Sequence, residues 1–183
     1  MDGSRAVILV EGVSDKLAIE TLAARRGRDL EAEGVAVVPI GGAQAIGRFL
    51  AELGPAVKVV GLCDAGEEGD FRRALRRAGF GSELTRAEME ELGFFVCEAD
   101  LEDELIRALG ADMVLRIVEA HGDLRPFQTL QKQTVWRGRD PHDQLRRFMG
   151  SGGRRKIRYA RILVEALDPA QVPRPLEGVL AHV

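Results

Sequence analysis

The amino-acid sequence predicts an α/β fold of the Rossmann-like kind, with a mainly parallel central sheet flanked by helices and a C-terminal helical extension. Two observations lead to this prediction. Short apolar runs alternate with helical patterns along the first part of the chain, and strand patterns stop after Leu101. Strands that alternate with helices are typical of a parallel, doubly wound sheet.

Four runs rich in Val, Ile and Phe are the expected strands: residues 6–10, 35–39, 57–63 and 94–97. They are mostly apolar rather than alternating, as is typical of strands covered on both faces. Helical periodicity lies between and after them, over 15–26, 44–53, 70–78, 101–109, 113–120, 141–149 and 156–167. We expect residues 1–110 to form the α/β core and residues 111–183 to form a basic helical extension packed on it.

Composition places the chain among ordinary soluble proteins. It has 183 residues, 45% of them hydrophobic and 30% charged, which suits one compact domain. Its apolar runs are too short to cross a bilayer and no secretory signal is evident, so a cytoplasmic protein without membrane contact is expected. Cys63 and Cys97 lie inside apolar runs without metal-ligand spacing, which predicts buried free thiols.

The net charge of −3 conceals an asymmetry. Residues 121–161 hold eleven Arg or Lys against three acids, a local balance of +8 that leaves −11 for the rest. An acidic body with a basic segment suits a metal-dependent enzyme that acts on a polyanion. It suits a salt-bridged helical subdomain equally well, so charge alone leaves both interpretations open.

Acidic residues follow three of the four expected strands. They are Glu11, Asp15, Asp64, Asp100 and Glu102, with Glu98 beside the last pair. The functional crevice of an open parallel sheet lies beyond the carboxyl ends of its strands, so these acids should gather at one edge. Crowded carboxylates repel one another unless cations lie among them. An oxygen-only ligand set favours Mg²⁺ or Mn²⁺ over zinc.

Some of these acids also have a structural interpretation. Asp100 can cap the helix at 101–109, while Glu102 and Asp15 can be first-turn acids favoured by the helix dipole. Glu11 and Asp64 directly continue buried strands and have no such role. Taken together, the five acids predict a metal site.

The same residues carry a family resemblance. "LVEG" at 9–12 resembles the first motif of the Toprim domain, the α/β module of topoisomerases, bacterial primases and several nucleases. The stretches "VEGVSDKLAIETLA", "VVPIGGAQAIGRFL", "VVGLCDAGEEG" and "DLEDEL" are similar to the Toprim region of OLD-family (overcoming lysogenization defect) ATP-dependent endonucleases. The resemblance covers residues 6–110 and, more loosely, the helical tail to about residue 167.

The resemblance implies a Toprim fold and divalent-metal-dependent hydrolysis of phosphodiester bonds in DNA. It implies one or two Mg²⁺ or Mn²⁺ ions, with Glu11 also serving as a catalytic bridge or general base. The implied ligands are Glu11, Asp15, Asp64, Asp100 and Glu102.

The chain departs from the family pattern in two places. The second aspartate of the family's Asp-x-Asp motif falls on Gly66, so one metal site should lose a ligand. Glu67, Glu68 or Asp70 can substitute, or the following helix can carry them away. OLD proteins also have an ATPase domain ahead of Toprim. The glycine-rich "GGAQAIG" at 41–47 lacks the Gly-Lys-Ser/Thr of a phosphate loop, so any ATPase is expected to be a separate partner chain.

The basic tail "GSGGRRKIRYARILVEAL" begins at a flexible hinge over residues 150–153. Arg154, Arg155 and Arg158 are the expected contacts to nucleic acid. Lys156 is a compact ammonium that can neutralise phosphoryl charge at one point. OLD-like nucleases have a functional lysine in a comparable tail, and this resemblance makes Lys156 a catalytic candidate. The alternative for each of these residues is a solvated basic helix face.

We therefore predict a metal-dependent DNA endonuclease of the OLD-like Toprim type. The alternative is a catalytically degenerate module that binds nucleic acid or an ATPase partner without cleaving. Tyr159, the one tyrosine, lies among core-facing neighbours, so topoisomerase chemistry is not expected. The sequence leaves open DNA versus RNA, nicking versus double-strand cleavage, and the oligomeric state.

Overall fold

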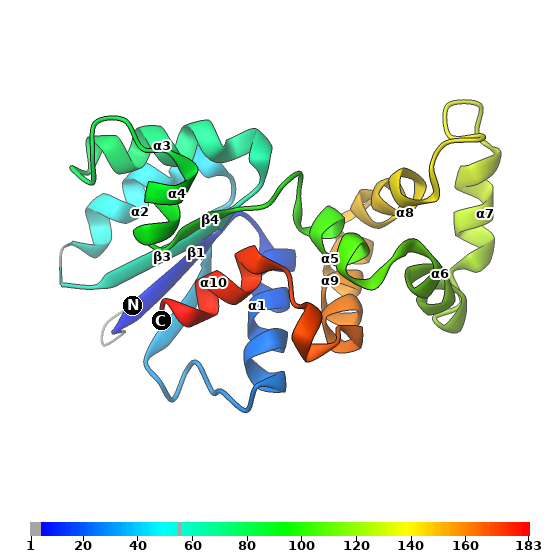
Figure 1. The fold of residues 1–183 in the computed structure, drawn as a ribbon, viewed down its shortest axis with the longest axis horizontal. Helices are drawn as coiled ribbons and strands as arrows, with labels where there is room; N and C mark the ends of the chain where they lie inside the picture. Colours follow the sequence, from blue (N-terminus) through cyan, green and yellow to red (C-terminus); the bar gives the residue numbers. More distant parts are fainter. Residues whose placement is uncertain (1–4, 55) are drawn as a thin grey trace.

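The computed structural model of the chain describes residues 5–54 and 56–183. Four parallel strands form one sheet in the order β2-β1-β3-β4 (Figure 1). Their bounds are β1 (Ala6–Val10), β2 (Val35–Pro39), β3 (Lys58–Cys63) and β4 (Phe94–Val96). The predicted parallel sheet is thus confirmed.

Helices cover both faces of the sheet because strand β1 is apolar on both sides. Val7 and Leu9 face a cluster formed with α2 (Ile46–Leu53), α3 (Glu68–Arg77) and α4 (Arg86–Glu91). Ile8 and Val10 face a second cluster, formed with α1 (Val13–Arg25) and α10 (Arg174–Ala181) among others. Three single-turn 3₁₀ helices complete this part: η1 (Ala43–Ala45), η2 (Ala65–Glu67) and η3 (Pro169–Gln171).

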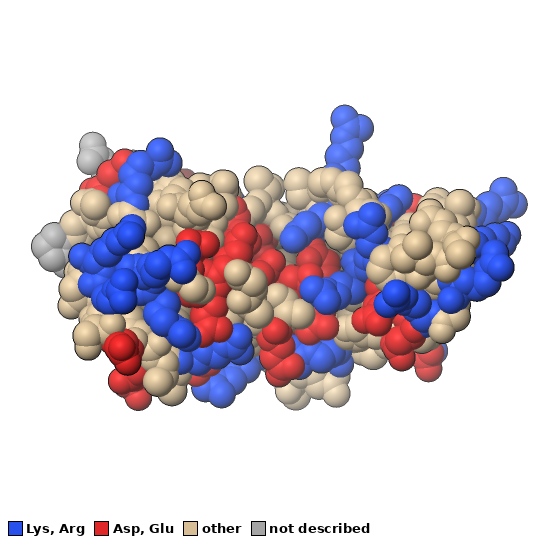
Figure 2. Space-filling view, turned by 90° about the horizontal axis from the view of Figure 1, so that it is seen from above, with Lys and Arg blue, Asp and Glu red and all other residues tan. Residues whose placement is uncertain are grey.

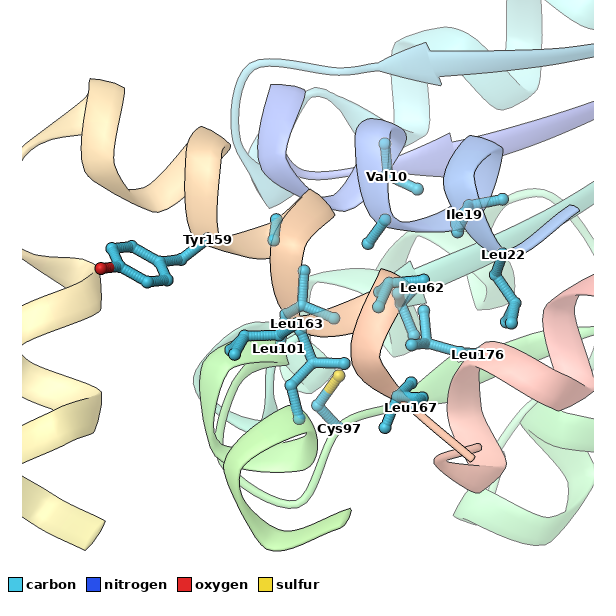
Figure 3. Packing of buried hydrophobic residues seen from close by; sticks show 14 of the residues in the cluster. Val10, Ile19, Leu22, Leu62, Cys97, Leu101, Tyr159, Leu163, Leu167 and Leu176 are labelled. Atoms are coloured by element: carbon cyan, nitrogen blue, oxygen red, sulfur yellow. The ribbon is translucent and has the colours of Figure 1, made fainter. Parts of the chain in front are cut away.

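The remaining helices extend from one end of the sheet. They are α5 (Leu101–Leu109), α6 (Ala111–Ala120), α7 (Leu124–Lys132), α8 (Pro141–Gly150) and α9 (Gly153–Ala166). Helices α6 and α7 lie farthest from the sheet, whereas α9 returns and packs along α1 (Figure 1). Leu163 and Leu167 join Leu62 of β3 and Leu101 of α5 in one hydrophobic cluster (Figure 3). The helical extension therefore shares its core with the sheet.

Two helices were not predicted. Thr85 opens α4, where its side chain and that of Glu88 form a reciprocal capping box, a pattern visible in the sequence. Helix α7 was the second omission.

The segment predicted as a hinge is a short turn, and α9 already begins at Gly153. Cys63 and Cys97 are buried and free, as predicted. In the described part of the chain, no helix has the length and apolarity needed to span a membrane.

The packing of α10 on the sheet leads to a stability prediction. A Cβ atom on Gly178 would lie 2.2 Å from Cε1 of the buried Phe95 ring. Gly178→Ala should therefore lower the free energy of unfolding by about 1–3 kcal/mol through overpacking. Gly153→Ala is the matched control, because a Cβ there meets nothing within 4 Å. Chemical denaturation of both variants measures the difference, and equal stability would show that α10 packs otherwise.

Candidate active site

The two acids that continue buried strands meet at the carboxyl edge of the sheet. Glu11 follows β1 and Asp64 follows β3, and the parallel register pairs Val10 with Leu62. Oε1 of Glu11 accepts a hydrogen bond of 2.7 Å from the backbone N–H of Asp64. Adjacent parallel strands that end in acid thus place Glu11 beside Asp64.

Asp15 and Asp100 have the helix-capping contacts that the alternative interpretation expects. Oδ2 of Asp15 accepts from the backbone of Gly12 at 3.1 Å and from the Ser14 hydroxyl at 3.3 Å. Oδ1 of Asp100 accepts from the backbone of Asp103 at 2.9 Å, and its Oδ2 pairs with Arg146 at 2.7 Å. These contacts orient both side chains, and a metal at Asp100 would compete with Arg146.

Lys156 pairs with one of these acids and lies near enough to two others to affect their charge. Its Nζ is 3.3 Å from Oε2 of Glu102. Glu102 is buried, with only 5% of its surface exposed. Burial raises the pKa of Glu102 and of Asp15, and Lys156 opposes the shift in both. Burial also lowers the pKa of Lys156, but Glu102, Asp15 and Asp64 outweigh it and leave that pKa raised. Helix α9 therefore places the Lys156 ammonium near the carboxylates of Glu102, Asp15 and Asp64.

The carboxyl groups of Asp64 and Glu11 hold protons more tightly than usual. Burial raises the pKa of Asp64 to about 7, with Asp15 adding to the shift and Lys156 opposing it. Burial and a hydrogen bond with Glu67 raise the pKa of Glu11 to about 9. In the absence of a further cation, the site therefore keeps protons on these two carboxyl groups at a higher pH than usual.

Glu67 is a candidate site residue that the sequence left undecided among three acids. Gly66 is exposed and has no side chain to contribute. The 3₁₀ turn η2, closed by a 3.0 Å bond from the Glu67 N–H to the Asp64 carbonyl, stacks residues three apart. It brings the Glu67 carboxyl to that of Glu11, with its Oε2 buried and without a partner. Glu68 and Asp70 instead pair with arginines. The Asp64-x-x-Glu67 spacing would have identified it only if a 3₁₀ turn had been predicted there.

A divalent cation at this edge would need several of these carboxylates as ligands. Among residues 5–54 and 56–183, no three Asp, Glu, His or Cys side chains already lie close enough to hold one ion. The donor chemistry nevertheless fits, because all the candidates are carboxylates. Oε1 of Glu102 is also buried without a hydrogen-bond partner. Binding an ion would bring the carboxylates closer together than they lie here.

The three arginines predicted to contact nucleic acid differ in their surroundings. Arg154 is exposed at the start of α9. Arg155 lies over the Phe148 ring, 4.1 Å from its centroid, and donates to the backbone carbonyls of Phe148 and Ser151. Arg158 pairs with Asp123 at 3.0 Å. Arg155 and Arg158 thus hold α9 in place, while Arg154 is open to a ligand.

The charges form bands on the surface. Figure 2 shows acidic side chains gathered in the middle of one face, with basic side chains on both sides of them. One basic group lies at the left, over the end of the molecule that carries α3 in Figure 1. A polyanion that crosses this face meets positive charge, then the acids, then positive charge again.

Comparisons with known proteins agree with this architecture. Residues 4–64 match the family model described as overcoming lysogenization defect protein-like, TOPRIM domain. The C-terminal region of the Xanthomonas campestris pv. campestris OLD protein is 28% identical in one structure, with a TM-score of 0.74 over 98% of this chain and 92% of that one. Another structure of that region is 26% identical, with a TM-score of 0.72 over 100% and 95% of the chains.

The C-terminal region of the Burkholderia pseudomallei OLD protein shares the fold at 20% identity. Its TM-score is 0.73 over 98% of this chain and 96% of that one. A comparison with curated protein sequences gives no significant match.

Fold and site together define a Toprim-type α/β domain, in which acids line the carboxyl edge of a parallel sheet. Residues 4–64 are thus similar to the OLD-like Toprim family, and the chain has the fold of an OLD C-terminal region along its length.

Proposed function

We propose that this protein is a divalent-metal-dependent nuclease that hydrolyses phosphodiester bonds in DNA. One observation carries the proposal. Buried acids with raised pKa values converge on Lys156 at the carboxyl edge of the sheet. Burying carboxylates costs folding free energy, so an uncompensated group of them is typical of a functional site. The OLD-like Toprim match supports a nuclease-type module.

The proposed ligands are Glu11, Asp15, Asp64, Asp100 and Glu102, together with Glu67 in place of the side chain missing at Gly66. Mg²⁺ or Mn²⁺ bound there would act as a Lewis acid and lower the pKa of bound water. Lys156 would neutralise charge on the scissile phosphate from its position beside Glu102. In the absence of metal, burial and the hydrogen bond with Glu67 raise the pKa of Glu11 to about 9, so Glu11 would act as a base only after losing its own proton.

Two observations favour a second candidate function, a module that binds nucleic acid or a separate ATPase chain without cleaving. Gly66 removes one acid from the Asp-x-Asp motif. Within the part of the chain that the structure describes, the carboxylates are also not assembled around one point. Cleavage is the property that distinguishes the two candidates, so a cleavage assay separates them.

The proposal predicts Mn²⁺- or Mg²⁺-dependent nicking of supercoiled plasmid that EDTA stops. The measurement is conversion of supercoiled plasmid to nicked or linear DNA, with binding followed in parallel by gel shift in Ca²⁺. Binding without cleavage in either metal would contradict the nuclease proposal and favour the module. An RNA of equal length run beside the plasmid distinguishes the two polymers.

A further inference from the structure

A basic hollow lies on α3, beside the acidic edge. Its volume is about 570 Å³, and it lies between α3 and the segment that enters α4. Four arginines and one acid line it: Arg72, Arg73, Arg76, Arg86 and Glu83. None of the site residues discussed above lines the hollow.

Two consecutive residues, Glu67 and Glu68, connect the candidate active site to the hollow. Glu67 reaches Glu11, whereas the next residue, Glu68, turns to the other side and pairs with both Arg72 and Arg86. The bond from Arg86 to Glu68 is 2.8 Å long. Glu68 thus joins the helix to the segment ahead of α4 and fixes the near wall of the hollow.

Two of the four arginines, Arg73 and Arg76, are open to an anion. Arg73 is exposed, and among the described residues it pairs only with Asp70, three residues earlier on the same helix. Arg76 is exposed, and its guanidinium makes no ion pair or hydrogen bond to any described residue. Exposed ion pairs contribute little in water, so a phosphate can replace the carboxylate beside Arg73. The guanidinium fork suits phosphate oxygens.

We propose that this hollow binds backbone phosphates of the nucleic-acid strand next to its reacting phosphate. The inference rests on the proposed nuclease function. A strand carries a phosphate every ~3.4 Å of duplex axis, so one phosphate at the acidic edge places the next ones over neighbouring surface. The acids alone would repel such a strand, and the hollow supplies opposite charge beside them. Figure 2 shows basic side chains beside the acids, over the end of the molecule that carries α3 in Figure 1.

The test is DNA binding by Arg73→Ala/Arg76→Ala, measured by fluorescence anisotropy with a labelled duplex in Ca²⁺ across a salt series. We expect Kd to rise roughly 10-fold near 0.1 M salt and the slope of log K against log salt to fall by about 1–2. Arg26→Ala/Arg116→Ala is the matched control. It also removes one ion-paired arginine, Arg26 with Glu177, and one exposed arginine, Arg116, for the same change in net charge. Melting temperatures establish first that both double variants are folded.

Normal binding by the control and weak binding by the α3 variant support the proposal. If both variants lose the same DNA affinity, the loss is due to net charge alone, and the proposal is overturned. Wild-type affinity in the α3 variant also overturns it, leaves the nuclease proposal intact and points to an acidic protein segment as the occupant. Failure of the wild-type protein to bind the duplex overturns the proposed function, and this inference with it.

Discussion

Glu11→Gln is expected to abolish metal-dependent DNA cleavage without lowering the melting temperature of the metal-free protein. The pKa of Glu11 is raised to about 9, so its side chain is neutral near pH 7 in the absence of metal. Glutamine matches that neutral form in shape. Its carbonyl can accept the 2.7 Å hydrogen bond from the Asp64 N–H, and its amide can donate to Glu67.

With metal, the same substitution removes a charged ligand and a proton acceptor. Cleavage should fall by about 10²-fold or more. The rise in melting temperature that Mn²⁺ gives the wild-type protein should shrink as well, because a ligand that binds more weakly stabilises the folded state less. Plasmid nicking and thermal unfolding with and without Mn²⁺ measure the two effects.

Glu20→Gln is the control for this substitution. Glu20 lies on α1 in an exposed pair with Lys16, away from the candidate site. The Glu20→Gln substitution should leave DNA cleavage and the Mn²⁺-dependent rise in melting temperature unchanged. Undiminished cleavage by Glu11→Gln would remove Glu11 from the site, and a large loss of metal-free stability would show that its proton is not bound as described.

The sheet and its acidic edge could be predicted because both depend on local patterns. Apolar strands alternate with helices, and Glu11 and Asp64 directly follow β1 and β3, so the parallel register alone makes them neighbours. Glu67 could not be chosen in the same way. The direction of the Glu67 side chain depends on η2 being a 3₁₀ turn, in which residues three apart lie directly above one another. In a regular α-helix the side chain would point elsewhere.

The pairing of Lys156 with Glu102 was also beyond local patterns. It depends on α9 folding back against α1 and α5, which follows from tertiary packing around Leu101 and Leu163. Charge pattern likewise did not distinguish the arginines of the tail. Arg155 lies on Phe148 and Arg158 binds Asp123, contacts set by helices that are remote in sequence. The arginines of α3 are visible as a pattern in the sequence, but the hollow was missed because Arg86 joins them from the start of α4 only in three dimensions.

Lys156→Met is expected to destabilise the protein more at pH 8 than at pH 6, and to abolish cleavage. Methionine keeps much of the apolar stem but leaves Glu102, Asp15 and Asp64 without the cation that lowers their pKa values. Breaking a buried ion pair on one side costs about 3–5 kcal/mol, and the partial exposure of Lys156 reduces this to roughly 2–3 kcal/mol at pH 8.

The direction of the pH effect follows from proton binding. An acid with a raised pKa binds more protons in the folded state than in the unfolded state. The free energy of unfolding therefore falls as pH rises from the unfolded pKa, near 4, to the folded one. For Asp64 the folded pKa is about 7 in the wild-type protein. Loss of Lys156 raises it further and extends the decline towards pH 8.

Urea unfolding of the wild-type and Lys156→Met proteins at pH 6 and pH 8 measures this difference. Lys132→Met is the matched control, since Lys132 is exposed on α7 and the structure gives it no ion pair within the described residues. Mn²⁺ should restore part of the lost stability at pH 8, because a divalent ion can take over the charge that Lys156 balanced. An equal loss at both pH values would show that Lys156 acts through packing alone, and the carboxylates would then not form one coupled site.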